Sequence, residues 1–154
     1  VSDNGTPIIY DPGYLFVAAA SQAKIPVITI PGPSALTAAT AISGFSGDAI
    51  IFEGRLPSTN HRLRQYLSQF RKERKTLVFY VRPRALTGLL KCLTQVLPRR
   101  QTVVAMNLTT GQETVLRGKP DELLSQIGSV AMDSSITVVI EGYRMGKPGN
   151  NLSP

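Results

Sequence analysis

The sequence predicts an α/β fold in which helices pack against a parallel or mixed sheet, and two observations support this prediction. Short apolar runs alternate along the chain with longer segments that have helical spacing. Glycine and proline, 13 and 11 among the 154 residues, separate many of these segments and limit each to the length of one element. A hydrophobic content of 42% is sufficient for a buried core.

The first part of the chain predicts two helices with a strand between them. Tyr14 to Lys24 is rich in alanine and predicts a helix, and the Pro-Val-Ile-Thr-Ile run at 26–30 predicts a buried strand. The Pro-Gly-Pro sequence at 31–33 is typical of a tight turn. Ser34 then stands where it can cap a helix that continues to about Ser43.

A loop of small residues, Gly44 to Asp48, marks a predicted domain boundary, and strands recur after it. Each predicted strand is a short run that contains β-branched or aromatic residues, which are common in sheets. These strands are Ile50–Glu53, Thr76–Val81, Thr102–Met106, Thr114–Arg117 and Ile136–Ile140.

Three helices are expected between these strands. The first covers His61–Lys75 and is basic and amphipathic, with one apolar face formed by Leu63, Tyr66, Leu67 and Phe70. The second covers Arg84–Leu97 and stops at a proline. The third is short and starts at Pro120, with two acidic residues in its first turn, where negative charge is favourable. The Gly-, Pro- and Asn-containing end of the chain, 143–154, predicts a flexible tail.

The composition excludes several classes of function. The one cysteine, Cys92, allows no disulfide within the chain, which fits a reducing, cytoplasmic setting, and its apolar neighbours predict a buried thiol. With one histidine, His61, and one cysteine, the sequence has too few ligands for a usual zinc site, and a Ser-His-Asp triad would depend on His61. The sequence also contains neither a Gly-x-Gly-x-x-Gly nor a P-loop fingerprint. We expect no secretion signal, and no apolar run approaches the roughly 20 residues of a membrane span. An enzyme with this sequence would depend on a bound cofactor.

The net charge of +7 is concentrated in one region of the chain. Nine of the 17 basic residues lie between Arg55 and Arg84, beside only Glu53 and Glu73. This concentration suits an anionic partner, and nucleic acid is the first candidate. A solvated helix face remains an open alternative, because charge alone shows no base-specific contact.

Three loops are candidates for ligand contacts, because ligands in open α/β sheets bind beyond the carboxyl ends of strands. The first is Ser2–Pro7, continuing to Asp11–Gly13, where Asp3 could accept hydrogen bonds from a ligand. The second is the Pro31–Ala35 turn, where a helix N-terminus offers free N–H groups. The third combines Tyr80–Arg84 with Met106–Thr110. From the residues alone, an ordinary turn, a helix cap and two surface loops remain alternatives.

Together these loops resemble motifs of one known family. The first 13 residues are similar to the motif V-S-D-A-G-T-P-x-I-S-D-P-G of bacterial small-subunit ribosomal RNA 2′-O-ribose methyltransferases. Those enzymes belong to the tetrapyrrole methylase superfamily, the class III methyltransferases. Further matches follow in order over about residues 1–142, at Ile30–Leu36, Ser43–Phe45, Phe52–Pro57, Thr76–Tyr80, Leu108–Thr109, Arg117–Gly118 and Val139–Gly142.

The resemblance implies a cleft between two α/β domains that binds S-adenosylmethionine. Residues 1–46 would be the end of the N-terminal domain, 47–142 a complete C-terminal domain with a mixed sheet, and 143–154 the tail. Since the chain opens at Val1, we expect a fragment without the first strand and its glycine-rich loop, inactive by itself. By position, the cofactor contacts would be Ser2, Asp3, Gly5, Thr6, Pro31, Gly32, Pro33, Ser34, Ala35, Tyr80, Met106, Asn107 and Leu108.

The resemblance also implies a homodimer that acts on small-subunit ribosomal RNA, and the scarcity of His and Cys gives no reason to expect a metal. The expected RNA contacts are basic residues of the second domain, namely Arg55, Arg62, Arg64, Arg71 and Arg74. No catalytic base is identified. Several polar positions depart from the family pattern, such as Val81-Arg82 in place of Glu-Ser. These departures keep two alternatives open: a noncatalytic RNA-binding or scaffold domain, and a methylase of tetrapyrroles or other small molecules.

Overall fold

The computed structural model describes residues 5–128 and 130–144. The predictions for Ser2, Asp3 and the tail from residue 145 lie outside the described residues. All five strands predicted beyond residue 46 are confirmed to within one residue. In chain order the elements are α1 (Tyr14–Gln22), α2 (Ala35–Ser43), β1 (Ile50–Glu53), α3 (Asn60–Ser68), β2 (Thr76–Val81), α4 (Pro83–Val96), β3 (Thr102–Met106), β4 (Thr114–Gly118), α5 (Pro120–Gln126) and β5 (Ile136–Ile140).

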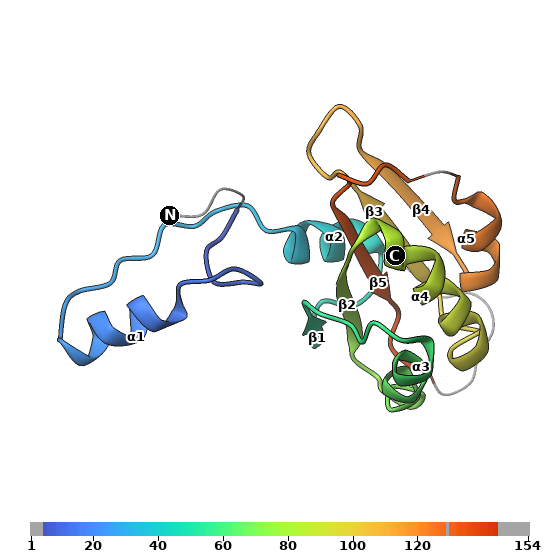
Figure 1. The fold of residues 1–154 in the computed structure, drawn as a ribbon, viewed down its shortest axis with the longest axis horizontal. Coiled ribbons are helices and arrows are strands. Elements are labelled where there is room, and N and C mark those ends of the chain that lie inside the picture. The colour runs from blue at the N-terminus through green and yellow to red at the C-terminus, as the bar shows by residue number, and fades with distance from the viewer. Residues whose placement is uncertain (1–4, 129, 145–154) are drawn as a thin grey trace, which may run out of the picture.

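The strands form one five-stranded sheet in the order β1-β2-β5-β3-β4 (Figure 1), and the sheet is mixed, as expected. β1 and β2 are parallel, whereas β5 is antiparallel to both β2 and β3, and β3 and β4 form an antiparallel hairpin. In this register Val81 and Met106 both stand opposite Ile136. The last residues of β2 and β3 therefore lie at the same end of the sheet as the first residues of β5.

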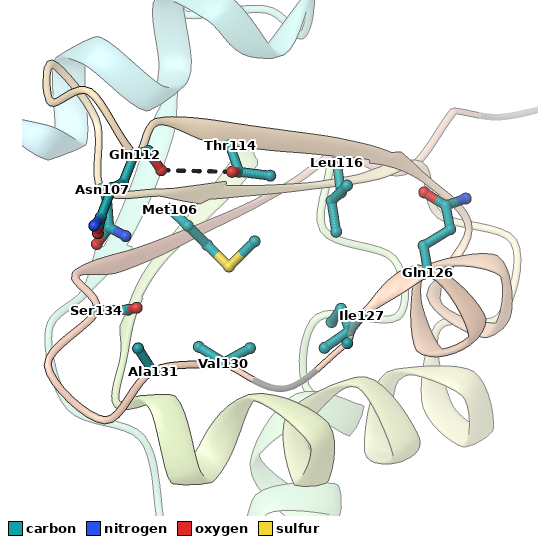
Figure 2. Close-up of a pocket in the computed structure, with 11 residues that line it drawn as sticks. Met106, Asn107, Gln112, Thr114, Leu116, Gln126, Ile127, Val130, Ala131 and Ser134 are labelled. Atoms are coloured by element: carbon teal, nitrogen blue, oxygen red, sulfur yellow. Dashed lines mark hydrogen bonds between the residues drawn. The ribbon is translucent and has the colours of Figure 1, made fainter.

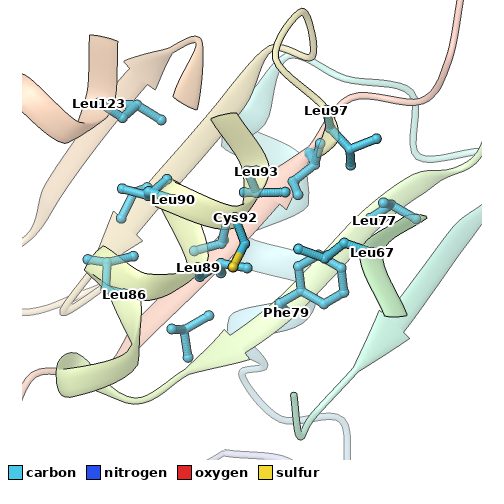
Figure 3. Close-up of a cluster of buried hydrophobic side chains, with 14 of the residues drawn as sticks. Leu67, Leu77, Phe79, Leu86, Leu89, Leu90, Cys92, Leu93, Leu97 and Leu123 are labelled. Carbon is cyan, nitrogen blue, oxygen red and sulfur yellow. The ribbon is translucent and has the colours of Figure 1, made fainter. Parts of the chain in front are cut away.

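The larger core lies between the sheet and helices α3, α4 and α5 (Figure 3). Alternate strand residues such as Phe79, Val104 and Val138 point to this face, because side chains alternate along a strand. They meet α4, whose buried leucines have helical spacing, at 86, 89, 90 and 93. Each large side chain buried in this way stabilises the fold by about 1.5–3 kcal/mol. Cys92 is buried in this core, as predicted.

Helix α2 packs on the opposite face of the sheet and is held at both ends. Its fully buried Ala39 lies in a smaller cluster with apolar residues of β2, β3 and β5. At its start the Leu36 N–H donates to the Tyr80 hydroxyl at 3.0 Å, and at its end Arg117 donates to the Ile42 carbonyl at 2.7 Å. Ser34 occupies the N-cap position, as predicted, but its side chain makes no capping bond with the described residues. A tyrosine from β2 supplies an acceptor at this helix end instead.

The basic helix is shorter than predicted, because α3 ends at Ser68 and not at Lys75. The buried Arg100 guanidinium donates hydrogen bonds, at 2.8, 3.2 and 3.0 Å, to the carbonyl oxygens of Phe70, Arg71 and Glu73. Since these carbonyls bind a side chain, the backbone beyond Ser68 turns toward β2 and leaves the helical path. Arg71 and Arg74 consequently lie in that turn and not on the helix.

Residues 5–34 form an arm that extends to one side of the sheet, with α1 within it (Figure 1). The predicted helix in this region is confirmed as α1, although none of its residues is buried. The predicted buried strand at 26–30 is wrong: the segment belongs to no sheet, and Ile28 and Ile30 are 86% and 85% exposed. A strand needs a hydrogen-bonding neighbour, and no described residue pairs with this segment. No helix of the described ranges is long and apolar enough to cross a membrane.

Candidate functional site

Two glycine- and proline-containing bends meet at the junction between the arm and the sheet. The Thr6 N–H donates to the Pro33 carbonyl at 2.9 Å, and the Thr6 hydroxyl lies 3.2 Å from the carbonyl oxygens of both Gly32 and Pro33. Gly5 has φ +74°, and a Cβ at this position would lie 2.6 Å from the Pro33 oxygen. Only glycine permits this backbone conformation and this close approach without strain. The first and second candidate loops of the sequence are therefore in direct contact.

A cleft of about 1000 Å³ lies beside the two bends. Its other wall consists of the Tyr80–Pro83 segment after β2, the Asn107–Gln112 loop after β3 and the Asp133–Thr137 segment at the start of β5. These segments meet because the ends of β2 and β3 lie beside the start of β5. The three candidate loops of the sequence thus surround one space.

Most of the predicted cofactor contacts line this cleft: Gly5, Thr6, Pro33, Ser34, Ala35, Tyr80, Asn107 and Leu108. Pro31, Gly32 and Met106 do not line it. Gly32 lies behind Thr6, whose hydroxyl donates to its carbonyl. Met106 packs against the core on the α4 side, because strand alternation directs its side chain to that face.

The cleft has further lining residues that were not predicted as cofactor contacts. Some belong to the candidate loops of the sequence, namely Asp11, Val81, Arg82, Pro83, Thr109 and Thr110. Sequence reasoning missed the others, which are Ile9, Tyr10, Ala38, Gly111, Gln112, Asp133, Ser134, Ser135, Ile136 and Thr137. Gly111 and Gln112 directly follow a candidate loop, so the rule on strand ends could have found them. The 133–137 segment leads into β5 and includes its first two residues, and only the antiparallel direction of β5 brings it to the cleft.

Three aromatic rings join the arm to the sheet beside the cleft. The Tyr80 ring packs edge-to-face against Phe52 at 4.7 Å and Tyr10 at 5.7 Å between ring centroids. The Tyr10 ring lies against Gly54, where a Cβ would collide with it. Such aromatic pairs contribute about 0.5–1.5 kcal/mol beyond simple burial. Tyr80 therefore contacts both walls of the cleft, since its hydroxyl also binds the start of α2.

The loop after β3 is rigidly held. Asn107 and Thr109 have φ of 51° and 65°, in the left-handed region. This conformation costs a residue other than glycine about 1–3 kcal/mol, so the surrounding contacts must hold it in place. The Asn107 N–H donates to the Ser135 carbonyl at 2.9 Å, and the Asn107 side-chain oxygen accepts from the Ser135 N–H at 3.0 Å. The Thr109 N–H donates to the Glu113 carboxylate at 2.7 Å. This loop is consequently preorganised as a wall of the cleft.

The described residues contain no group of three or more His, Cys, Asp or Glu side chains that could hold a metal ion. His61 is exposed on α3. Burial raises the pKa of the Cys92 thiol, which favours its protonated, unreactive form. Burial, followed by the nearby Glu53 carboxylate, raises the pKa of the Tyr66 phenol. None of these groups belongs to the lining of the cleft.

The predicted RNA-contact residues Arg55, Arg62, Arg64, Arg71 and Arg74 are all exposed. Arg62 and Arg64 lie on α3, and Arg64 donates to the side-chain oxygen of Gln95 at 3.2 Å. Arg71 and Arg74 lie in the turn after that helix. The basic residues are thus available to solvent on the second part of the chain.

The protein thus belongs to the α/β class, with a mixed sheet and a cleft at the ends of its strands. The sequence matches the family of Tetrapyrrole (Corrin/Porphyrin) Methylases over residues 1–124, and the chain belongs to that family.

Among curated relatives, the chain is similar to proteins named ribosomal RNA small subunit methyltransferase I. It is 39% identical to the protein of Thermotoga maritima over 142 residues, which is 92% of this chain and 64% of the relative. It is 40% identical to the protein of Mycobacterium tuberculosis over 143 residues, which is 92% of this chain and 50% of the relative. The chain therefore spans between half and two thirds of the length of these relatives.

Solved structures of the same fold include two methyltransferases. The methyltransferase CobJ superposes with a TM-score of 0.59 at 19% identity, covering 92% of this chain and 64% of CobJ. Uroporphyrin-III C-methyltransferase from Thermus thermophilus, complexed with S-adenosyl homocysteine, superposes with a TM-score of 0.56 at 20% identity, covering 89% of this chain and 62% of the enzyme. At these identities the likeness concerns the fold.

Proposed function

We propose that the protein containing this chain is an S-adenosylmethionine-dependent methyltransferase that modifies a ribose 2′-hydroxyl of small-subunit ribosomal RNA. One observation carries the proposal: the two bends and the loops at the strand ends enclose a single cleft. The names of the curated relatives support ribosomal RNA as the substrate.

The residues of the cleft fit this cofactor. A space of about 1000 Å³ is large enough for a cofactor, since small-molecule sites typically occupy about 300–1,000 Å³. Ala35, Ala38 and Leu108 offer apolar surface for an adenosyl group. The Ser34 hydroxyl, at the start of α2, offers a polar contact to the amino acid end. Gly5 keeps the two bends close enough to form one continuous wall.

The bound cofactor would supply an electrophilic methyl group, which leaves sulfur as a bond to the substrate oxygen forms and the hydroxyl proton departs. The residues of the chain would contribute by orienting the cofactor and the substrate, because correct positioning of two reactants can remove a large part of the activation barrier. The hydrogen bonds of Asn107 and the aromatic contacts of Tyr80 fix the wall on the second side. No residue is assigned as the base.

The domain division belongs to the proposal. We assign residues 1–46 to an N-terminal α/β domain and 47–142 to the C-terminal domain, with 143–154 as the tail. The five-stranded sheet, which begins at Ile50, supports the second unit. A homodimer in the cytoplasm is part of the same proposal. The five exposed arginines, 55, 62, 64, 71 and 74, are proposed to contact RNA phosphates, since a net charge of +7 favours an anionic partner.

The test uses the intact protein and two measurements. Calorimetric titration should detect binding of S-adenosylmethionine, and transfer of a labelled methyl group should occur to unmethylated small ribosomal subunits. RNA binding without cofactor binding would contradict the proposed methyltransferase activity and favour a noncatalytic RNA-binding domain. Methylation of a porphyrin-like compound without methylation of RNA would contradict the proposal that RNA is the substrate.

The RNA contacts have a separate test in salt dependence. Replacing Arg62, Arg64, Arg71 and Arg74 by Gln should reduce the slope of log Kd against log salt, because each lost phosphate contact lowers the slope by about 0.7–0.9. An unchanged slope would reject this surface as the contact.

A further inference from the structure

A second cavity, of about 300 Å³, adjoins the cleft and is named here the side cavity. It lies between the β3-β4 hairpin, the end of α5 and the segment that precedes β5 (Figure 2). Asn107, Gln112 and Ser134 line both the side cavity and the cleft, so these residues separate two neighbouring spaces. A ligand with two joined parts could therefore place one part in each.

The lining of the side cavity is uncharged and combines apolar with neutral polar side chains. Figure 2 shows Met106 reaching into it from β3, with Leu116 on one side and Ile127 and Val130 across from them. None of the described residues that line it carries a charge. Charged groups such as phosphates would lose their hydration there without a compensating partner. The cavity instead suits a flat, neutral group with apolar faces.

Polar contacts in the side cavity come from primary amides. Gln112 and Gln126 lie at opposite ends of it, and Asn107 lies near Gln112 (Figure 2). The Asn107 side-chain oxygen already accepts from the Ser135 N–H, so its NH₂ group remains as the donor. An amide can donate and accept at once, which matches the paired donors and acceptors at the edge of a nucleobase.

We propose that the side cavity binds the base of the nucleotide whose ribose is methylated in the cleft. This inference rests on the proposed function. In a nucleotide, a neutral base is bonded directly to its ribose. Because the side cavity adjoins the cleft, a ribose in the cleft could place its base in the side cavity. Enzymes that do chemistry on a nucleobase remove it from the stack and bind it in a pocket, which shows that a single base can be held in this way. Single-stranded RNA is likewise recognised through splayed bases that bind side-chain amides.

The test replaces residues that line the side cavity and not the cleft. Thr114→Phe fills the cavity, and Gln126→Leu removes one amide. The matched controls are Thr87→Phe on the exposed side of α4 and Gln101→Leu at the exposed position just before β3. In the intact protein, both cavity variants should lower kcat/KM for small-subunit RNA by about tenfold or more. The Kd for S-adenosylmethionine should stay within about twofold, and the controls should change neither quantity.

A second arm isolates the base and does not require catalysis. Fluorescence anisotropy compares a short oligoribonucleotide spanning the acceptor nucleotide with the same strand lacking that base. The unmodified protein should bind the complete strand about tenfold more tightly, and Thr114→Phe should abolish this difference. This result without methyl transfer would reject the proposed function and retain the base site.

Two outcomes would overturn the inference. Weaker binding of S-adenosylmethionine by the cavity variants, with unchanged discrimination of the RNA base, would assign the cavity to the adenine of the cofactor. Methylation by the unmodified protein with unaltered base discrimination in both cavity variants would show that the cavity binds no base, while the proposed function would stand.

Discussion

The arm, residues 5–34, and the body, residues 35–128 and 130–144, contain similar apolar residues in opposite environments. Phe79 in the body is fully buried, whereas Phe16 in the arm is 83% exposed. The body has a sheet on which its helices pack, and α1 in the arm has no buried residue. Apolar content alone therefore does not bury a segment. A partner surface is also needed, and the arm meets the body through Tyr10, whose ring packs against Tyr80 and Gly54.

The largest expected difference compares these two phenylalanines. In the 154-residue chain, Phe79→Ala should lower the free energy of unfolding by about 3–5 kcal/mol, because it leaves a cavity in the core. Phe16→Ala should change it by about 0.5 kcal/mol or less. Urea denaturation measures both. Equal losses would contradict the contrast between arm and body. A loss above about 1 kcal/mol for Phe16→Ala in the intact protein would indicate that the arm is covered there.

The next prediction concerns Arg100 and the backbone carbonyl groups that it binds in the turn after α3. Arg100→Met should destabilise the body by about 3 kcal/mol, since several carbonyl oxygens lose a charged donor. The neighbouring, exposed Arg99→Met is the control and should change stability by about 0.5 kcal/mol or less. Thermal unfolding monitored by circular dichroism separates the two. Similar melting temperatures for both variants would refute this role of Arg100.

Much of the body could be predicted from its sequence, because its strands are apolar runs flanked by turns. The end of α3 could not, since it depends on Arg100, about 30 positions away in the chain. The strand predicted at 26–30 was wrong for a related reason: its residues favour extended structure, but pairing requires another strand. The bends of the cleft were predictable from their glycines and prolines. Tyr10 was not, because its position depends on contact with Gly54.

A smaller effect tests how the start of α2 is held on the sheet, next to the arm. Tyr80→Phe removes the acceptor of the Leu36 N–H and should cost about 1 kcal/mol. Tyr14→Phe is the control, because Tyr14 is 65% exposed. That control should change stability by about 0.5 kcal/mol or less by urea denaturation. A larger loss for Tyr14→Phe than for Tyr80→Phe would exclude the assigned hydrogen bond.

The smallest predicted effect concerns pH and the interior of the body. Burial raises the pKa of Cys92, so the folded protein retains the thiol proton to higher pH than the unfolded chain does. This stabilisation is complete below about pH 8.5, the pKa of an unfolded thiol, and is lost as pH rises through the raised folded value. Cys92→Ala should therefore lose less stability between about pH 7 and 10 than the unmodified chain. Identical losses would contradict a buried thiol.

Cofactor affinity of a Gly5→Ala variant tests the central claim that the two bends form one binding wall. The substitution places a Cβ against the Pro33 carbonyl and strains a positive φ, whereas Gly47→Ala, the control, meets only an ordinary contact with Thr40. Calorimetry on the intact protein should show that Gly5→Ala weakens S-adenosylmethionine binding by about tenfold or more and that Gly47→Ala leaves it unchanged. Equal affinity in the Gly5→Ala variant and the unmodified protein would contradict the account.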